Sequence, residues 1–406
     1  MKKICMVSTT HILMDSRIYY KEAISLKNNG YDVTCIYVGR KDSSGITKEG
    51  IKYIEVKPCY KVYNALDKIF EYKNFIYERF SYDTYLKILK KCKEVKCDLY
   101  HLHDIYLLQI CENLKKMYFK PKIVYDVHES YVDIVLDYNK NKRNINKYLF
   151  YLYLYFWEKV KALKCDFIIN VEENINRTFE KYLGDSKVDL IYNYPLEEYL
   201  MKNSKEETKL EDKKYDLVYC GGITKIRGVM NILEAINIGK QYKKDISVIF
   251  IGPINDSNLQ KDIKNYIEEN DLSDNVFFKG KISFERVWNY YKESKIGLVP
   301  LHDIRKYVKA IPIKMFEYMI MGLPVIGSNL PHIREVVLNE KYICGEVVDN
   351  IENPKEFWHS IYKILSDQEL YNKYSINARQ SIKYIYNWSI MEKKLLSIYN
   401  NILDKR

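Results

Sequence analysis

The chain has 406 residues, too many for one ordinary domain and enough for two α/β domains of roughly 200 residues each. Hydrophobic residues make up 47% of the sequence, so two cores can form, and disordered and collagen-like classes are excluded. The formal net charge is +11 with acidic and basic residues interleaved, a modest excess that suits anionic partners such as nucleotides or phospholipid headgroups. Because the charge is spread out and forms no basic stripe with stacked aromatic residues, we expect no nucleic-acid partner.

The nine cysteines are scattered, and several lie in apolar runs that resemble strands. A free cysteine in such a run acts as a small hydrophobic residue, and the spacing of Cys92 and Cys97 gives no zinc motif. The first residues, MKKICMVSTTHI, contain no apolar stretch of signal-peptide length, and no run approaches about 18 apolar residues. We therefore expect a cytoplasmic protein without a membrane span.

In the first half of the chain, short runs rich in β-forming residues alternate with longer segments of helical periodicity. The helical spacing of apolar residues is clearest at 17–28 and 172–183. Strand, helix and strand in this order predict right-handed βαβ units and a parallel sheet. The expected strands cover residues 3–8, 31–38, 51–57, 98–103, 122–128, 166–171 and 188–193.

A charged segment at 199–214 then interrupts the alternation, and we expect it to link an N-terminal domain (1–198) to a C-terminal domain (215–384). Residues 385–406 are expected to form a final helix that crosses back to the first domain. The predicted fold class is α/β, with two Rossmann-like, doubly wound parallel-sheet domains facing across a cleft at the carboxyl ends of their strands. The second domain is expected to hold strands at 216–221, 247–252, 275–280, 295–301, 323–328 and 345–349, and helices at 353–366, 368–383 and 385–404.

A glycine-rich turn follows the first strand of the second half, in the segment 219–228 (YCGGITKIRG). Gly221 and Gly222 let the backbone approach a phosphate, and the helix expected from Val229 offers unpaired N–H groups and a positive dipole. Arg227 adds a fixed charge that can bind two oxygens at once. The same pattern also fits an ordinary strand-to-helix turn with a solvent-facing arginine.

The segment 310–327 (AIPIKMFEYMIMGLPVIG) predicts a helix that is opened by Pro312 and ended by Gly322 before a strand. Lys314 and Glu317 are three residues apart, so they share one face of this helix. Against a cleft, Glu317 would accept both hydroxyls of a ribose while Lys314 neutralises a phosphate. On a solvated face the two would form only a surface ion pair, although the neighbouring Met, Phe and Ile residues argue against solvent.

These motifs resemble those of a known family, the retaining glycosyltransferases of family 4, also called glycosyl transferases group 1, which have GT-B architecture. The resemblance extends over roughly residues 1–385. PIKMFEYMIMGLPVIGS resembles the donor-site signature in which the glutamate, here Glu317, binds the ribose of a nucleotide-sugar. YCGGITKIRGVMNILEAI resembles the phosphate loop, which implies donor contacts from Gly221, Gly222, Thr224 and Arg227.

In the N-terminal half, the resemblance places His128 at the cleft near the sugar and the acceptor, with Glu129 beside it. Asp15 and Arg17 follow the first strand at the same edge, where they contact the acceptor or a phosphate, or where Asp15 simply caps the first helix. The motifs that fall where the family has comparable ones are DSRI (15–18), HLHD (101–104), YDVHES (125–130) and NYP (193–195).

His101, His103 and Asp104 form a further group that resembles a set of metal ligands. The two histidines share one face of their expected strand because they are two residues apart. No third ligand is apparent in the sequence, and no Asp-x-Asp pair occurs, so we expect no metal site.

The sequence departs from the family pattern at two positions. The family commonly has a second glutamate eight positions before the one that binds ribose, and this chain has Lys309 there. Many members also have arginine after the first glycine of the phosphate loop, where this chain has Gly222. Lys309 is retained as a donor-binding candidate, and its charge favours an acidic sugar such as a uronate.

The resemblance implies that the chain transfers a sugar from a nucleotide-sugar, a UDP-sugar first of all, with retention of configuration and without a metal or cofactor. The implied acceptor is a lipid-linked or growing cell-surface polysaccharide. His128, Arg227, Lys314 and Glu317 would act in catalysis. Two other functions stay open, a sugar-nucleotide epimerase of the same architecture and a catalytically silent, nucleotide-binding partner of another transferase.

Segment 140–163 is rich in Lys, Arg, Tyr, Phe and Trp, a composition typical of a helix at a membrane interface. The alternative is a helix packed on the N-terminal sheet. In the first case, the protein would make peripheral contact with the inner face of the cell membrane.

Overall fold

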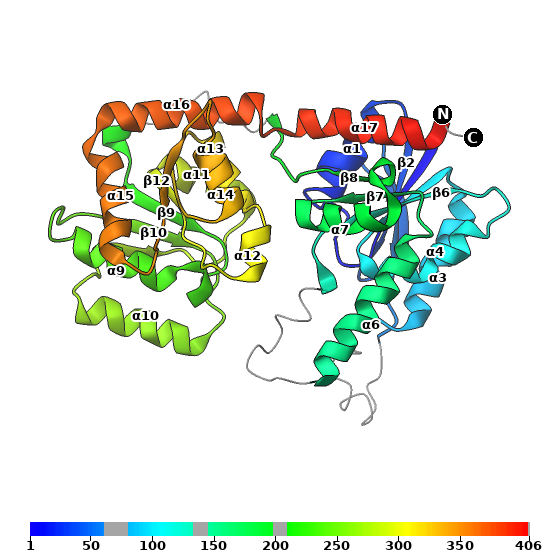
Figure 1. Ribbon diagram of the computed structural model, residues 1–406, viewed down its shortest axis with the longest axis horizontal. Helices are drawn as coiled ribbons and strands as arrows, with labels where there is room; N and C mark the ends of the chain where they lie inside the picture. Colours follow the sequence, from blue (N-terminus) through cyan, green and yellow to red (C-terminus); the bar gives the residue numbers. More distant parts are fainter. Residues whose placement is uncertain (61–79, 133–144, 198–208, 405–406) are drawn as a thin grey trace. The chain divides into compact units, whose positions relative to one another are not determined.

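The computed structural model describes residues 1–60, 80–132, 145–197 and 209–404, which form two compact units (Figure 1). The N-terminal unit comprises Met1–Asn193 together with Met391–Arg406, and the C-terminal unit comprises Tyr194–Ile390. Most of the expected linker, 199–214, lies outside the described residues.

The N-terminal unit is built on one eight-stranded sheet of order β3-β4-β2-β1-β5-β6-β7-β8. Its neighbouring strands are parallel except for β3 and β4, which are antiparallel. The sequence did not predict β3, because its residues, SSGI, are poor in β-branched and aromatic side chains. The strands are β1 (Lys3–Ser8), β2 (Asp32–Val38), β3 (Ser43–Ile46), β4 (Lys52–Val56), β5 (Leu99–His103), β6 (Lys122–Val127), β7 (Phe167–Asn170) and β8 (Val188–Leu190).

Helices cover both faces of this sheet, because apolar residues occur on both sides of the strands. In β5, Tyr100 and Leu102 join a core that includes side chains from α3, α4, α6 and α7. His101 lies on the other face, where the hydroxyl of Tyr399 in α17 is 2.7 Å from its Nδ1. The helices are η1 (Ile18–Ala23, a π-helix), α1 (Ile24–Asn28), α3 (Tyr82–Val95), α4 (Leu108–Lys115), α6 (Ile145–Ala162), α7 (Glu173–Leu183) and α17 (Trp388–Asp404).

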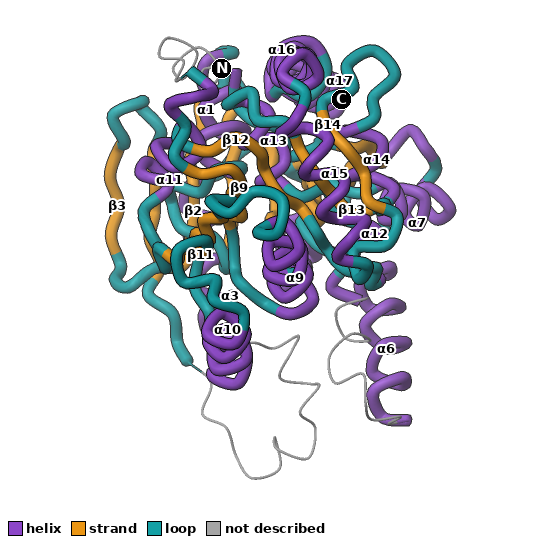
Figure 2. Tube along the Cα trace, turned by 90° about the vertical axis from the view of Figure 1, so that its left-hand side faces the viewer, coloured by secondary structure: helices purple, strands orange, loops and turns teal. Residues whose placement is uncertain are grey.

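The C-terminal unit has a six-stranded parallel sheet of order β11-β10-β9-β12-β13-β14 (Figure 2). Helices α9, α10 and α15 share a core on one face of it. On the other face α13 packs so closely that a Cβ at Gly297 of β12 would overlap the ring of Tyr318. The strands are β9 (Tyr215–Cys220), β10 (Val248–Ile251), β11 (Val276–Phe278), β12 (Ser294–Val299), β13 (Val325–Ser328) and β14 (Gly345–Val348). The helices are α9 (Val229–Gly239), α10 (Ser257–Glu269), α11 (Phe284–Lys292), α12 (Arg305–Lys309), α13 (Ile313–Ile320), α14 (Pro331–Val337), α15 (Pro354–Ser366) and α16 (Gln368–Tyr384).

The last helix, α17, begins in the C-terminal unit, and from Met391 onward it belongs to the N-terminal unit. Two of its side chains accept hydrogen bonds from the segment between α1 and β2. Tyr31 donates to Asn400 Oδ1 at 2.6 Å, and Asn29 donates to Glu392 Oε1 at 3.1 Å. The chain therefore returns to its starting unit at the end, and both units have the α/β, Rossmann-like fold that the sequence predicted.

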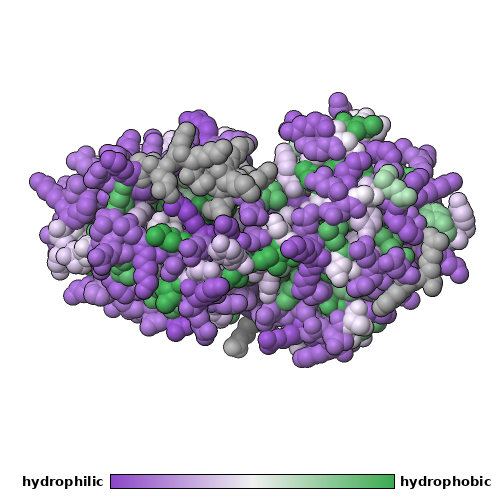
Figure 3. Space-filling view, turned by 90° about the horizontal axis from the view of Figure 1, so that it is seen from above, coloured by the Kyte–Doolittle hydropathy of each residue, from purple (hydrophilic) through white to green (hydrophobic). Residues whose placement is uncertain are grey.

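On the face drawn in Figure 3, hydrophilic side chains dominate and hydrophobic ones appear as small, separate patches. Within the described ranges, no helix combines the length and the apolar character needed to cross a bilayer.

Candidate functional site

The glycine turn after β9 lies against two cationic side chains. Gly221 has a φ of 126°, in the region that only glycine adopts readily. A Cβ at Gly221 would lie 3.3 Å from Lys314 Nζ and 3.5 Å from Arg227 Nη1, and one at Gly222 would lie 3.2 Å from Arg227 Nη1. The glycine turn and the Pro-opened helix, which are far apart in the sequence, therefore meet at Gly221.

Lys314 presents a buried ammonium group that has no hydrogen-bond partner among the described residues. Its Nζ lies 3.8 Å from the centroid of the Tyr219 ring. Burial, followed by the nearby charge of Arg227, lowers the pKa of Lys314 to about 7. An unpaired buried cation is costly, and beside the glycine turn this ammonium is placed where it can bind an anion.

Glu317 does not neutralise Lys314 but is bound from another helix. The Tyr291 hydroxyl of α11 donates to Glu317 Oε2 at 2.8 Å. The ring of Tyr291 is buried and packs edge-to-face against Tyr318, with centroids 5.2 Å apart. The expectation that Lys314 and Glu317 share a helix face holds, but they do not form the surface ion pair that the sequence also allowed.

Arg227 ends a short 3-10 turn, Lys225–Arg227, that precedes α9. Its Nε donates to the Tyr307 hydroxyl at 3.1 Å, which ties the turn to α12. Lys309 is the last residue of the same short helix and is partly buried. The Oγ1 of Thr224 is buried and, within the described part of the chain, has no hydrogen-bond partner. The turn and α13 together thus bring Arg227, Lys314 and the unsatisfied hydroxyl of Thr224 to one place, a combination that suits a diphosphate.

A second polar cluster lies at the carboxyl ends of β1, β5 and β6 in the N-terminal unit. His128 follows β6, and its Nε2 lies 3.3 Å from Asp126 Oδ2 and 3.1 Å from His103 Nδ1. The side chain of His128 is 11% exposed, so it forms the accessible edge of the cluster. Glu129 is exposed beside it.

Arg17, expected at the acceptor side, has its guanidinium in the interior. It donates to Asp126 at 3.2 Å and to the Ile191 carbonyl at 2.7 Å, and its Nε lies 2.9 Å from Glu22 Oε1. Asp126 and Glu22 are fully buried. The Arg17 guanidinium therefore holds the N-terminal strand ends together and is not presented to a ligand.

We expect Arg17→Leu to lower the free energy of unfolding of the N-terminal unit by about 3–5 kcal/mol, because it leaves the buried Asp126 carboxylate without its cation. Urea denaturation followed by amide hydrogen exchange in β5 and β6 measures this change. The matched control is Arg177→Leu, which breaks an exposed pair with Glu173 at 3.1 Å and is expected to cost about 0.3–0.5 kcal/mol. Equal losses in both variants would contradict the assignment.

Asp15 both starts the first helix and faces the cluster. Its Oδ1 accepts the backbone N–H groups of Arg17 at 2.8 Å and Ile18 at 2.9 Å. Its Oδ2 lies 2.9 Å from His11 Nδ1. The capping alternative that the sequence left open is therefore present, together with a contact toward the cluster.

Sequence reasoning missed His11 and the part played by Asp104. His11 Nε2 lies 3.7 Å from Asp104 Oδ2, and Asp104 accepts hydrogen bonds from the hydroxyls of Thr10 and Tyr131. Asp104 is fully buried and has a φ of 83°, a strained value for a non-glycine residue. The signal in the sequence was that histidine or aspartate follows each of three neighbouring parallel strands.

Two groups of residues in this unit bring His and carboxylate atoms close enough together to consider a metal ion. The buried group of Glu22, His101, His103 and Asp126 already contains the Arg17 guanidinium, so a divalent cation there would face a fixed positive charge. Burial lowers the pKa of His103 to about 4, so this histidine is neutral. The partly exposed group is His11, Asp104 and His128.

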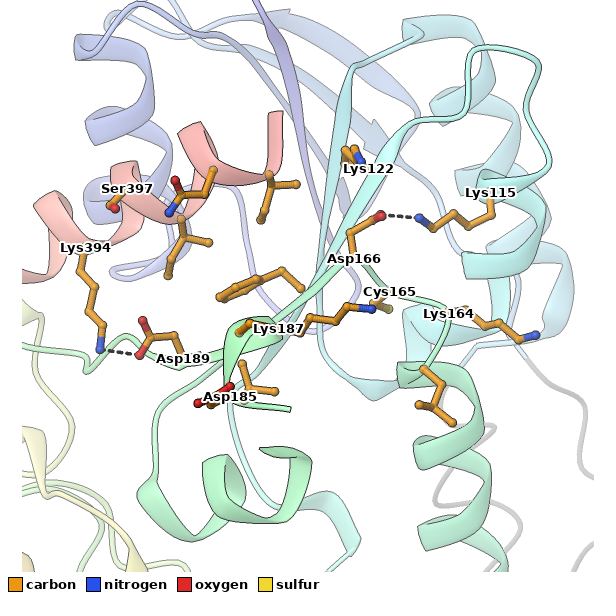
Figure 4. A pocket seen from close by; sticks show the side chains of 17 residues that line it. Lys115, Lys122, Lys164, Cys165, Asp166, Asp185, Lys187, Asp189, Lys394 and Ser397 are labelled. Carbon is orange, nitrogen blue, oxygen red and sulfur yellow. Dashed lines mark hydrogen bonds and ion pairs between the residues drawn. The ribbon is translucent and has the colours of Figure 1, made fainter. Parts of the chain in front are cut away.

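A cavity of about 640 Å³ lies at the opposite end of the N-terminal sheet (Figure 4). Its walls are formed by residues at the beginning of β6, β7 and β8 and by residues of α17. Several lysines in these walls form ion pairs with carboxylates. Lys115 binds Asp166, and Lys394 Nζ lies 2.6 Å from Asp189 Oδ1. The cavity is therefore separate from the polar cluster at the carboxyl ends of the strands.

Comparisons with known proteins agree with the geometry of the C-terminal unit. Residues 201–381 match the family model described as glycosyl transferases group 1. An uncharacterized glycosyltransferase of Methanocaldococcus jannaschii, MJ1069, is 26% identical over 260 residues, which cover 62% of this chain. That match spans 63% of MJ1069, less than two thirds of its length.

Two further proteins extend the comparison. The capsular polysaccharide biosynthesis glycosyltransferase CapM of Staphylococcus aureus is 21% identical over 63% of this chain and 67% of its own length. The structure of Alr3699/HepE of Anabaena in complex with UDP and glucose has a TM-score of 0.67 at 12% identity, over 98% of this chain and 100% of that one. Residues 201–381 are thus similar to the glycosyl transferases group 1 family, in a chain with the two-domain GT-B fold.

Proposed function

We propose that the protein is a glycosyltransferase that moves a sugar from a nucleotide-sugar to a saccharide acceptor. The observation that carries the proposal is the buried ammonium of Lys314, without a hydrogen-bond partner among the described residues, which lies with Arg227 beside the Gly221 turn. A nucleoside diphosphate supplies the negative charge that this site lacks. UDP is the first candidate for the nucleotide, supported by the UDP bound to the similar HepE structure.

In this proposal the C-terminal unit binds the donor. Arg227 and Lys314 contact the diphosphate, Thr224 and the turn of Gly221 and Gly222 line it, and Glu317 accepts the ribose hydroxyls. Lys309 lies on α12, the helix whose Tyr307 hydroxyl accepts a hydrogen bond from Arg227. It is the candidate contact to the sugar.

The bond between the anomeric carbon and the phosphate oxygen breaks with its electron pair remaining on the nucleoside diphosphate. Arg227 and Lys314 stabilise the charge that develops there, and their burial strengthens the effect. The acceptor oxygen bonds to the anomeric carbon, and its proton leaves with the departing phosphate, while His128 orients the acceptor. We propose retention of configuration without a metal ion, in line with the family that the motifs resemble.

The test is calorimetry and turnover with UDP-, GDP-, ADP- and dTDP-sugars on the wild-type chain. We expect one nucleotide class to bind and to be consumed when an acceptor is supplied. Binding without any turnover over a broad panel of acceptors would favour a silent partner, and interconversion of free donors would identify an epimerase. The absence of binding by every donor would refute the proposal.

We further propose that the acceptor is lipid-linked or part of a surface polysaccharide and that the protein reaches it at the cytoplasmic face of the membrane. The name of the similar CapM supports a polysaccharide acceptor. Helix α6 packs on its unit with one side, through Leu154 and Trp157. Its other side carries an exposed apolar stripe, defined by Leu149, Tyr153, Phe156 and Val160 of the helix and by Leu163 directly after it, which are 46–56% exposed.

The stripe has the spacing of one helix face, with steps of four and three residues. Figures 1 and 2 both show α6 extending beyond the sheet of its unit. Lys159 and Lys164 flank the stripe, which suits the headgroups of anionic lipids. The sequence left open whether this helix packs on the sheet or has an interfacial face, and in the structure one side packs while the other is exposed and apolar.

We expect the double variant Tyr153→Glu, Phe156→Glu to reduce binding to vesicles of phosphatidylglycerol at least about tenfold. The reason is that the variant no longer buries these two aromatic side chains in the membrane interface, which stabilises the bound state. Flotation of the full chain with these vesicles measures the bound fraction. The control is Ile376→Glu, at a residue of α16 that is 54% exposed, which should leave binding unchanged. Equal binding of the wild type and the double variant, or no binding by the wild type, would contradict the membrane proposal.

A further inference from the structure

Two free cysteines from distant parts of the chain meet beside the cavity at the amino end of the N-terminal sheet (Figure 4). Cys111 belongs to α4 and Cys165 lies between α6 and β7, and their Sγ atoms are 3.7 Å apart. Cys165 lines the cavity, whereas Cys111 is fully buried behind it. Since the sulfur atoms of a disulfide bond are about 2.05 Å apart, a small movement of the two side chains would join them.

The cavity surrounds Cys165 with more positive than negative charge. Five lysines line it against three aspartates, and the ion pairs of Lys115 and Lys394 use two of those aspartates. Three further lysines have side chains that form no ion pair or hydrogen bond with the described residues: Lys122 of β6, Lys164 after α6 and Lys187 of the 3-10 turn η4 (Asp185–Lys187). The cavity therefore favours an anionic ligand beside the Cys165 thiol.

The two thiols influence each other's ionisation. One sulfur donates a hydrogen bond to the other, and such a bond stabilises a thiolate at the accepting sulfur. The hydrogen bond from Cys165 lowers the pKa of Cys111, which burial opposes and the charge of Lys115 assists. The same hydrogen bond, together with burial, raises the pKa of Cys165. The pair thus loses one proton more readily than an isolated buried thiol, and the thiolate is the form that reacts with disulfides.

We propose that Cys111 and Cys165 form a thiol–disulfide exchange site, oxidised to an intramolecular disulfide by a low-molecular-weight disulfide that carries carboxylates and binds in the lysine-lined cavity. The cavity has a volume of about 640 Å³, which is in the range of small-molecule sites. The site is independent of the proposed transferase activity, because it lies at the other end of the sheet from His128 and in a different unit from Lys314.

The exchange takes two steps and consumes one molecule of the small disulfide. In the singly deprotonated pair, Cys165 passes its proton to Cys111, and the Cys165 thiolate attacks one sulfur of the ligand. The S–S bond of the ligand breaks, one half stays on Cys165 as a mixed disulfide, and the other half leaves as a thiolate that takes the proton from Cys111. The Cys111 thiolate then attacks Cys165 Sγ and expels the second half as a thiolate. The protein dithiol loses two electrons, and the small disulfide is reduced to two thiols.

The test exposes the reduced full chain to three disulfides of different charge: glutathione disulfide (anionic), cystamine (cationic) and 2-hydroxyethyl disulfide (neutral). Peptide mapping without reduction identifies the product. We expect glutathione disulfide to join Cys111 to Cys165 at least about tenfold faster than cystamine does, because the lysines attract its carboxylates. Of the nine thiols in the chain, the two of this pair should be lost, and dithiothreitol should restore both.

Two variants separate the roles of the thiols and the lysines. Cys111→Ala should stop at the mixed disulfide of glutathione on Cys165, because the second thiol is missing. The double variant Lys164→Gln, Lys187→Gln should reduce the rate preference for glutathione disulfide over cystamine at least about fivefold. The matched control is Lys48→Gln, at an 83% exposed side chain between β3 and β4, the strands at the other edge of the sheet, and it should leave the preference unchanged.

Three results would overturn the inference. The first is that Cys111 and Cys165 stay reduced while the partly exposed Cys59 forms an adduct. The second is a disulfide between other cysteines in place of this pair. The third is oxidation of the pair by cystamine at least as fast as by glutathione disulfide, which would exclude an anionic ligand. Because the mapping uses the wild type, the inference stays testable if Cys111→Ala does not fold.

Discussion

Lys314→Met is expected to weaken the binding of UDP at least about 100-fold while leaving the C-terminal unit as stable as in the wild type or more so. The loss follows from removing the ammonium that lies beside Gly221 and has no hydrogen-bond partner within the described residues. The gain in stability follows because the free protein carries the cost of that unpaired buried cation. A residue that served only the fold would show the opposite sign of the stability change.

The pH dependence of the stability shows whether Lys314 binds a ligand or supports the fold. The pKa of Lys314 is lowered to about 7 in the folded protein, against an ordinary value near 10.5 when unfolded. The unfolded chain therefore binds more protons between about pH 7 and 10.5, and stability contributed by this group rises with pH across that window. The penalty is present in full below about pH 7, and Lys314→Met should remove it.

Donor binding shows the reverse trend. A diphosphate favours the charged ammonium, so binding takes up a proton, and the affinity for UDP should fall as the pH rises above about 7. Calorimetry in two buffers of different ionisation enthalpy counts that proton directly. In Lys314→Met the uptake should vanish. A variant that binds UDP as tightly as the wild type, or one that is destabilised with its proton uptake intact, would show that Lys314 does not contact the phosphates.

The parts of the molecule that depend on local sequence were predictable. Most of the strands were expected within a few residues, because parallel strands buried on both faces appear as short apolar runs. The expected strand at 188–193 was too long, since β8 ends at Leu190. The donor-site candidates Arg227, Lys314 and Glu317 come from contiguous motifs, and the fold brings them to one turn.

The N-terminal cluster depends on contacts that a single sequence does not reveal. Arginine is seldom buried, and the partner that buries Arg17 is Asp126, 109 residues away. Asp104 was considered only as part of the HLHD motif and as a metal ligand, because nothing in the sequence connects it to His11. The contact arises from the parallel register of β1 with β5, which pairs Ser8 with His103 and so brings both following turns to one edge.

Glu317→Ala is expected to weaken the binding of UDP at least about 100-fold, because a carboxylate that accepts two ribose hydroxyls contributes about 1.5–3 kcal/mol for each of them. Comparing UDP with 2′-deoxy-UDP localises the effect. The wild type should prefer UDP at least about tenfold, and the alanine variant should bind the two equally. Calorimetry with both nucleotides on both proteins completes a thermodynamic cycle.

Tyr291→Phe supplies the matched control for this cycle. It removes only the hydroxyl that donates to Glu317 Oε2 at 2.8 Å, so the carboxylate stays but is held less firmly. We expect a smaller loss of UDP affinity with the preference over 2′-deoxy-UDP retained, since Glu317 is still present. If Glu317→Ala weakens both nucleotides by the same factor and lowers the thermal stability, the carboxylate supports α13 and does not contact the ribose. If it changes neither affinity, the ribose lies elsewhere, and the Lys314 site must be reassigned to an anion other than a nucleotide.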